Sequence, residues 1–173
     1  MFLANPRVVD ICEQQRIVYS VDGEARHYTC DFVVTWASGL RVAYEVKYAA
    51  DADRKDTASL LLTVAQGCTD EVADEFQIIT EKELDLATIE NSVLVVACAN
   101  DQDGQALDAV ERWLGEASET VTLVEIERGT GLGSRARRAA VALIQAGRLT
   151  VPPGEVIHAD LPLSNNGALR RAT

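Results

Sequence analysis

Alternation of polar and apolar residues predicts three β-strands in the first third of the chain. RIVYSV (16–21) alternates and is followed by Asp22-Gly23, a dipeptide typical of a two-residue hairpin turn. HYTCDFVVTW (27–36) is rich in aromatic and β-branched residues, and LRVAYEVKY (40–48) alternates again after a short turn. We therefore expect a three-stranded antiparallel meander.

The spacing of apolar residues changes after residue 50. A stripe within residues 52–73 predicts a helix, and FQIIT (76–80) is short and nearly all apolar, which favours a strand buried on both faces. The segment 81–99 could hold a strand at SVLVVACA, but its opening residues follow a helical pattern and we favour a buried helix. Residues 104–117 predict an amphipathic helix. The order βββαβ followed by helices indicates an α+β, or mixed α/β, fold.

The tail predicts a helix, a glycine-rich turn, a second helix and a hairpin. Ser134 is expected to cap the second helix, and Gly147 stands where a C-terminal glycine belongs. A helix-turn-helix followed by a hairpin is the outline of a winged helix. We expect one domain over 1–86 and a helical, winged-helix-like domain over 87–173.

Charge is distributed unevenly along the 173 residues. The net charge of −11 argues against a nucleic-acid partner. However, residues 1–50 carry 5 basic and 6 acidic side chains, residues 51–126 carry 4 and 18, and residues 127–173 carry 7 and 3. We expect the acidic middle to be repelled by DNA and the two ends to tolerate it.

Two classes of protein are disfavoured. There is no apolar run of 18 residues and no signal-peptide pattern, so we expect a cytoplasmic protein without a membrane partner. The four cysteines are scattered without a C-x-x-C pair, which favours reduced thiols over a zinc site.

The hairpin over 28–48 carries three charged residues among mostly apolar ones. Strand periodicity puts Glu45 and Lys47 on one face, and the turn brings Asp31 roughly opposite Glu45. Two carboxylates so close repel unless a cation lies between them, and Mg²⁺ or Mn²⁺ prefers such oxygen ligands. The Val46 carbonyl could add a ligand, and Lys47 could hold or activate a water. The alternative is a cross-strand salt bridge on a solvated face.

The hairpin and its flanks resemble a known family. Residues 5–47 are similar to the N-terminal catalytic domain of TnsA-like transposon endonucleases, within the PD-(D/E)xK nuclease superfamily, and the tail resembles that family's C-terminal winged-helix part more loosely. The matching motifs are EQQRIVY (13–19) for the family's "EQP…I.Y", YTCDF (28–32) for "YTPDF", EVK (45–47), and FQIITEKEL (76–84) for the closing strand.

The resemblance implies a metal-dependent DNA endonuclease that cuts the 5′ ends of a mobile element, beside a DDE-type transposase and an AAA+ regulator. By this resemblance Asp31, Glu45 and Lys47 are catalytic, Asp31, Glu45 and Val46 hold Mg²⁺ or Mn²⁺, and Gln15 positions the substrate. The partners implied are DNA and those transposition proteins, and a homo-oligomer is left open. The alternative function is a catalytically silent adaptor that binds DNA or transposition partner proteins.

The chain departs from the family pattern in two respects. Cys30 and Gln15 stand where the family has prolines. The family also places a further glutamate on a helix before the first strand, and we expect that helix to be absent; Glu13 and Glu24 are poor replacements. The site is then incomplete, completed by a partner, or supplied by a segment upstream of Met1.

An arginine cluster marks the second helix of the tail. Arg135, Arg137 and Arg138 lie near its start, opposite an apolar face. They form either a solvated basic surface or a set of phosphate contacts to DNA, because arginine neutralisation of the backbone dominates sequence-independent DNA affinity.

Overall fold

The computed structural model describes residues 1–68, 72–101 and 103–169. The fold is α+β and divides into two compact units. The N-terminal unit contains Phe2 and residues 7–84, and the C-terminal unit contains Met1, residues 3–6 and the chain from Asp85 onward. Among the described residues, none of the helices is long and apolar enough to cross a membrane.

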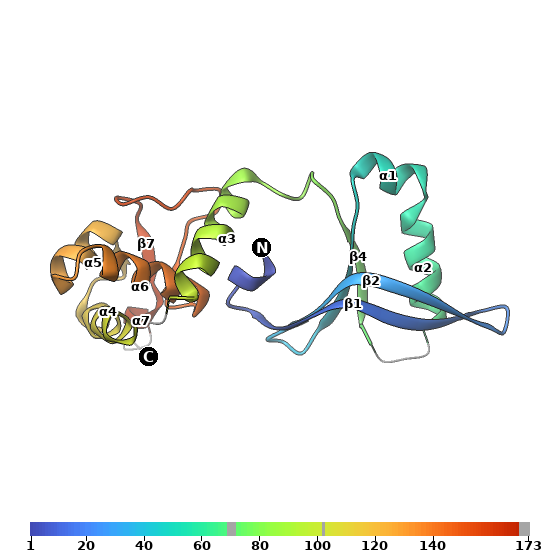
Figure 1. The fold of residues 1–173 in the computed structure, drawn as a ribbon, viewed down its shortest axis with the longest axis horizontal. Helices are drawn as coiled ribbons and strands as arrows, with labels where there is room; N and C mark the ends of the chain where they lie inside the picture. The colour runs from blue at the N-terminus through green and yellow to red at the C-terminus, as the bar shows by residue number, and fades with distance from the viewer. Residues whose placement is uncertain (69–71, 102, 170–173) are drawn as a thin grey trace. The chain divides into compact units, whose positions relative to one another are not determined.

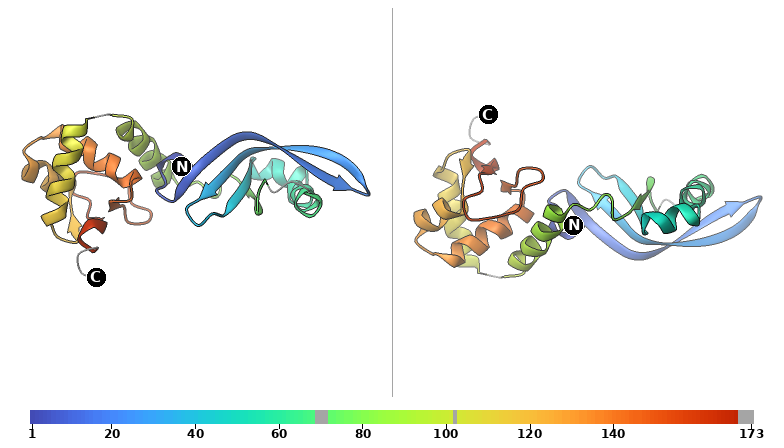
Figure 2. Two further views of the ribbon diagram at one scale, coloured as in Figure 1. Left: turned by 90° about the horizontal axis from the view of Figure 1, so that it is seen from below. Right: turned by 90° about the horizontal axis from the view of Figure 1, so that it is seen from above.

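The N-terminal unit is built on a mixed four-stranded sheet in the order β1-β2-β3-β4, of which β1, β2 and β4 are labelled in Figure 1. β1 (Val8–Val21), β2 (Glu24–Trp36) and β3 (Arg41–Val46) are antiparallel, and β4 (Glu75–Ile79) runs parallel to β3. The β1–β2 hairpin twists along its length (Figure 2) and begins well before the predicted strand at 16–21. The sequence pattern missed its first half because most side chains there are exposed on both faces.

The helical segment after β3 is divided in two. α1 (Ala49–Arg54) and α2 (Thr57–Gly67) replace the single helix predicted over 52–73, of which residues 69–71 lie outside the described part of the chain. The break is at Asp56, which has a left-handed φ of 46° that an α-helix cannot accommodate.

The sheet of the N-terminal unit has an apolar cluster on each face. The first cluster includes Ile17, Tyr19, Cys30, Val33 and Ala43 and is covered by α2 through Val64. The second is centred on Val34, Val42, Tyr44 and Ile79, with the rings of Phe2, Phe32 and Trp36 packed against it. Thus the two faces expected for β3, with Val42 and Tyr44 opposite Ala43, are confirmed. Val46, expected to pack with Val42, is instead 42% exposed.

The prediction that residues 76–80 form a strand buried on both faces is wrong. β4 is the edge strand of the sheet, and of its residues only Ile79 is buried. An edge strand has one neighbour instead of two, so apolar composition alone overstated its burial.

The C-terminal unit combines helices with a small sheet. Its longer helices are α3 (Leu86–Ala99), α4 (Gly104–Glu116), α5 (Leu123–Thr130) and α6 (Ser134–Gln145). The sheet order is β5-β7-β6, formed by β5 (Thr120–Val121), β7 (Leu163–Asn165) and β6 (Leu149–Thr150), and α7 (Asn166–Leu169) follows. The predicted helices over 81–99 and 104–117 are confirmed. Their starts are capped by the side chains of Asp85 and Asp103, which accept hydrogen bonds from backbone N–H groups.

The helix pair of the tail is present, with one difference. α6 begins at Ser134 itself, its N-cap is Gly133, and no side chain caps it, so the prediction that Ser134 is the cap is wrong. Gly133 has a φ of 54°, a positive value that glycine adopts without strain, and the chain enters the helix there without a capping hydroxyl. Gly147 has a φ of 70° just after the end of α6, which confirms its predicted place.

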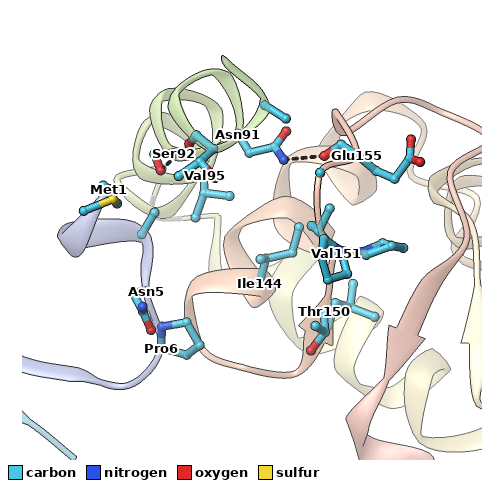
Figure 3. A pocket seen from close by; sticks show the side chains of 17 residues that line it. Met1, Asn5, Pro6, Asn91, Ser92, Val95, Ile144, Thr150, Val151 and Glu155 are labelled. Atoms are coloured by element: carbon cyan, nitrogen blue, oxygen red, sulfur yellow. Dashed lines mark hydrogen bonds between the residues drawn. The ribbon is translucent and has the colours of Figure 1, made fainter. Parts of the chain in front are cut away.

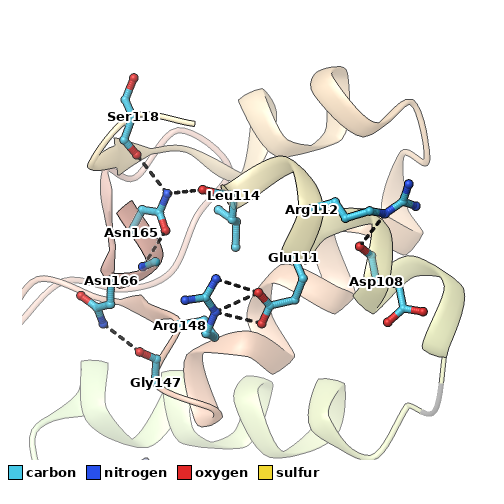
Figure 4. Close-up of polar contacts among 10 residues, drawn as sticks. Asp108, Glu111, Arg112, Leu114, Ser118, Gly147, Arg148, Asn165 and Asn166 are labelled. Carbon is cyan, nitrogen blue, oxygen red and sulfur yellow. Dashed lines mark hydrogen bonds and ion pairs between the residues drawn. The ribbon is translucent and has the colours of Figure 1, made fainter. Parts of the chain in front are cut away.

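A buried amide fixes the small sheet to the helices. Asn165 is fully buried, and its Nδ2 donates to the carbonyls of Leu114, at 2.9 Å, and Ser118, at 3.1 Å, while its Oδ1 accepts from the Gly167 N–H (Figure 4). All of its polar atoms are therefore satisfied without water. Nearby, the Arg148 guanidinium pairs with Glu111 (Figure 4).

Candidate functional site

The β2–β3 register places Asp31 opposite Glu45. The pairing of Phe32 with Tyr44 is the last in the ladder, and Asp31 and Glu45 come one step beyond it. Beyond this pair, the Asp31 side chain and not a backbone carbonyl accepts the next hydrogen bond from β3: its Oδ2 accepts from the Val46 N–H at 2.8 Å. The predicted opposition of the two carboxylates is thus present in the fold.

Glu45 is a buried carboxylate with one unsatisfied oxygen. The residue is 7% exposed, and its Oε1 is paired with the Lys47 ammonium. Its Oε2 is buried and has no hydrogen-bond partner, and the same holds for the hydroxyl of Tyr28. Burial, then the adjacent Glu45, raises the pKa of Tyr28, although no hydrogen bond of regular geometry joins the two groups. A buried carboxylate oxygen without a partner is costly, which marks this atom as a site for a cation or a donor.

Lys47 is held as an ammonium. Its hydrogen bond to Glu45 raises its pKa, and the nearby charges of Asp31 and Asp51 act in the same direction. At neutral pH Lys47 therefore donates hydrogen bonds and does not accept a proton. It is suited to holding a water or neutralising an anion, and unsuited to acting as a base in this state.

The residues fit a divalent ion of the magnesium type. Each Asp31 oxygen accepts one hydrogen bond and keeps a further lone pair, and Glu45 Oε2 is free. In the described ranges no group of three or more His, Cys, Asp or Glu side chains could hold a metal ion. Mg²⁺ nevertheless needs only one or two carboxylates, because it retains several waters. The Val46 carbonyl stays a predicted third ligand.

Neither glutamate considered as a replacement joins this group. Glu13 pairs with Phe32, whose ring packs against the other face of the sheet. Glu24 lies at the start of β2, exposed and 3.8 Å from the Arg26 guanidinium. The two carboxylates on β2 and β3 thus remain without a third from β1.

Gln14 contacts the candidate site, and the sequence analysis missed it. Its Nε2 donates to Asp31 Oδ1 at 3.2 Å. Gln15, predicted to position substrate, pairs with Cys30 and directs its amide to the Arg16 carbonyl at 3.2 Å, so its role stays a prediction. The signal for Gln14 was available, because a two-residue turn at 22–23 sets residue 14 opposite residue 31.

The three arginines of α6 are each engaged by a carboxylate of the C-terminal unit. Their Nε atoms lie 2.6 to 2.7 Å from carboxylate oxygens, in the pairs Arg135–Asp103, Arg137–Glu127 and Arg138–Asp101. All three arginine side chains are about half exposed, as expected for an outer face. A phosphate would have to compete with these carboxylates, so phosphate contact stays a prediction.

The C-terminal unit contains an open pocket of a different character. It has a volume of about 330 Å³ and is lined by the N-terminal segment, α3, Ile144 and the turn after β6 (Figure 3). Among the described residues that line it, Glu155 is the single carboxylic one, and its main-chain carbonyl accepts a hydrogen bond from Asn91 (Figure 3). The pocket therefore offers no pair of carboxylates for a divalent ion.

Comparison with known protein families finds a match, which lies almost entirely in the N-terminal unit. The family model described as the TnsA-like endonuclease N-terminal domain matches residues 5–82, which include β1 to β4 and the Asp31–Glu45 pair. No curated protein matches the chain. Residues 5–82 are therefore similar to the N-terminal domain of TnsA-like endonucleases, and this match supports a TnsA-like endonuclease.

Proposed function

We propose that the N-terminal unit is a metal-dependent DNA endonuclease with a PD-(D/E)xK core, acting in transposition or recombination. The observation that carries the proposal is the buried Glu45 carboxylate with its unpartnered Oε2, opposite Asp31 and beside Lys47. The element order of three antiparallel strands, helices and a strand parallel to the third supports this core. The family match supports the same interpretation.

The chain's own residues have separate roles in this proposal. Asp31, Glu45 and the Val46 carbonyl would hold Mg²⁺ or Mn²⁺. When bound, such an ion activates water and stabilises negative charge on a phosphoryl oxygen. The Lys47 ammonium, which pairs with Oε1 of Glu45 and leaves Oε2 free, would donate a hydrogen bond to the attacking water or to the phosphate. The acidic pair alone would repel DNA, so the positive charge of Lys47 also reduces the net negative charge near the bound phosphate.

The C-terminal unit is proposed to be a winged-helix-like domain, with the division near residue 86. The order β5, α5, α6, β6, β7, with β7 between the other two strands, supports this assignment. The proposed partners are DNA, a transposase and an AAA+ regulator, as the family implies.

DNA contact by the arginines of α6 can be tested in both directions. Neutralising Arg135, Arg137 and Arg138 should weaken binding equally across sequences and reduce the salt slope by about one for each phosphate that is no longer neutralised. Freeing two of them with Asp101→Asn and Glu127→Gln should strengthen binding, because the paired carboxylates no longer compete. Unchanged affinity in both sets would remove α6 from the DNA interface.

The second candidate is an adaptor without catalytic activity. It is favoured by the absence of a third metal-binding side chain near Asp31 and Glu45 among the described residues. In that case the Glu45–Lys47 pair is structural, and the two units bind partner proteins.

Incubation of the protein with supercoiled plasmid and Mn²⁺ or Mg²⁺ separates the two functions. We expect nicking by the wild-type chain and none by Glu45→Gln, which keeps the size of the side chain and removes its charge. Nicking that persists in Glu45→Gln points to a contaminating nuclease. No nicking by the wild type, with an upstream extension or transposition partners added, favours the adaptor.

A further inference from the structure

Gln14 has an unusual backbone conformation for a residue within a strand. Its φ is 51°, in the left-handed region that non-glycine residues seldom occupy. Its neighbours Glu13 and Gln15 are still paired in register with Phe32 and Cys30. The ladder therefore continues through Gln14 without an extra residue on either strand.

The side chains of the hairpin change faces at this position. On β2, Tyr28 and Cys30 pack in the cluster covered by α2, whereas Phe32 and Val34 pack in the cluster on the other face. Residues two apart on a strand normally share a face, so the alternation is interrupted at Asp31, between Cys30 and Phe32. The residue directly across from Asp31 in this register is Gln14.

The Asp31 carboxylate is held from two strands. The Gln14 amide on β1 donates to Oδ1 at 3.2 Å, and the Val46 N–H on β3 donates to Oδ2 at 2.8 Å. With one donor on each oxygen, rotation of the carboxylate breaks at least one hydrogen bond. One lone pair on each oxygen remains for a further contact.

We infer that Gln14 is a positioning residue, whose left-handed backbone and side-chain amide orient the Asp31 carboxylate for the divalent ion. The inference rests on the proposed function and adds a residue from β1 to a site otherwise built on β2 and β3. Partners of this kind fix ligand orientation, and their loss typically weakens metal affinity by roughly 10–100-fold. A strained conformation that persists beside such a ligand is consistent with that task.

The contact is first tested in the protein without metal. In NMR spectra, the Gln14 side-chain amide resonance, assigned by its loss in Gln14→Gly, should shift in Asp31→Asn, while the Gln15 amide should not. A Gln14 amide that does not respond to Asp31→Asn overturns the inference, whatever the protein does with metals.

The consequence is then measured as the Kd for Mn²⁺. Gln14→Gly should bind Mn²⁺ roughly 10–100-fold more weakly than the wild type. Its melting temperature without metal should be unchanged or higher, because glycine adopts the left-handed φ without strain. Cys12→Gly, which also introduces a glycine at an exposed position of β1, should leave the Kd unchanged.

The outcomes distinguish the inferred role of Gln14 from the proposed metal-dependent function. An unchanged Kd in Gln14→Gly overturns the inference. A lower melting temperature of Gln14→Gly, together with an equal loss of affinity in Cys12→Gly, also overturns it, because these results would indicate a general weakening of the strand. If the wild type binds no Mn²⁺ while the Gln14 amide responds to Asp31→Asn, the proposed function fails and the orienting contact stands.

Discussion

Replacing Asp31 with asparagine should separate the metal-binding role of this residue from its structural one. The amide oxygen of asparagine can still accept from the Val46 N–H, which donates to Asp31 at 2.8 Å, and Gln14 can turn its amide to present an oxygen. The substitution therefore keeps the hydrogen-bond geometry and removes one negative charge opposite Glu45.

Two opposing contributions set the stability of this variant without metal. Two exposed hydrogen bonds to a charged carboxylate become hydrogen bonds between neutral groups, a combined loss of about 1 kcal/mol. Repulsion between carboxylates about 5 Å apart is about 3 kcal/mol at an effective dielectric constant of 20, and we discount it to about 1 kcal/mol because Lys47 neutralises Glu45. The free energy of unfolding should thus change by less than about 1 kcal/mol.

The metal-bound state should respond differently. Mg²⁺ at about 100 times its Kd stabilises the wild type by about 2.7 kcal/mol, whereas a variant that binds about 100-fold more weakly gains only about 0.4 kcal/mol. Urea unfolding of the N-terminal unit measures both values. The chain has two tryptophans, so in a Trp113→Phe background the fluorescence reports on Trp36 alone.

Two results would refute this reasoning. Equal stabilisation of wild type and Asp31→Asn by Mg²⁺ would show that the ion binds elsewhere. A loss of more than about 3 kcal/mol without metal would mean that Asp31 is primarily a structural ion-pair partner, as expected for a broken buried pair.

The C-terminal unit provides two further predictions. Hydrogen bonds from Arg135 and then from a backbone N–H lower the pKa of Asp103 from 3.8 to about 2. Its contribution to stability is full above its unfolded-state pKa and is lost as the pH falls toward about 2, so Asp103→Asn should flatten acid unfolding between pH 4 and pH 2; an unaltered acid profile would contradict the pairing. A Cβ on Gly129 would overlap the indole of Trp113, so Gly129→Ala should cost about 1–3 kcal/mol in urea unfolding. Gly104→Ala meets open space and should change stability by no more than about 1 kcal/mol; equal effects would refute the packing argument.

Much of the N-terminal site could be predicted from local sequence. The turn at 22–23 and the turn before β3 determine the register of the hairpins, and that register brings Gln14, Asp31 and Glu45 into line. Alternation within β3 then separates Glu45 from the residues of the opposite face. These relations depend on turn length and strand period alone.

Other features depend on tertiary contacts that no local pattern contains. The reversal of side-chain direction at Gln14 requires a left-handed φ, which cannot be predicted from the sequence for a glutamine. The carboxylate partners of Arg135 and Arg138 lie 32 and 37 positions away in the chain. The local sequence therefore shows an arginine-rich helix face without showing the carboxylates that pair with it. The exposure of β4 follows from its place at the edge of the sheet, which its composition does not encode.

Calorimetric titration of the full chain with Mn²⁺ tests the central claim most directly, with Asp31→Asn/Glu45→Gln as the comparison. We predict one ion per wild-type chain and no measurable binding by the double variant, whose melting temperature without metal should stay close to that of the wild type. Binding of equal affinity in the two proteins, or no binding by the wild type, would contradict a divalent ion held by Asp31 and Glu45.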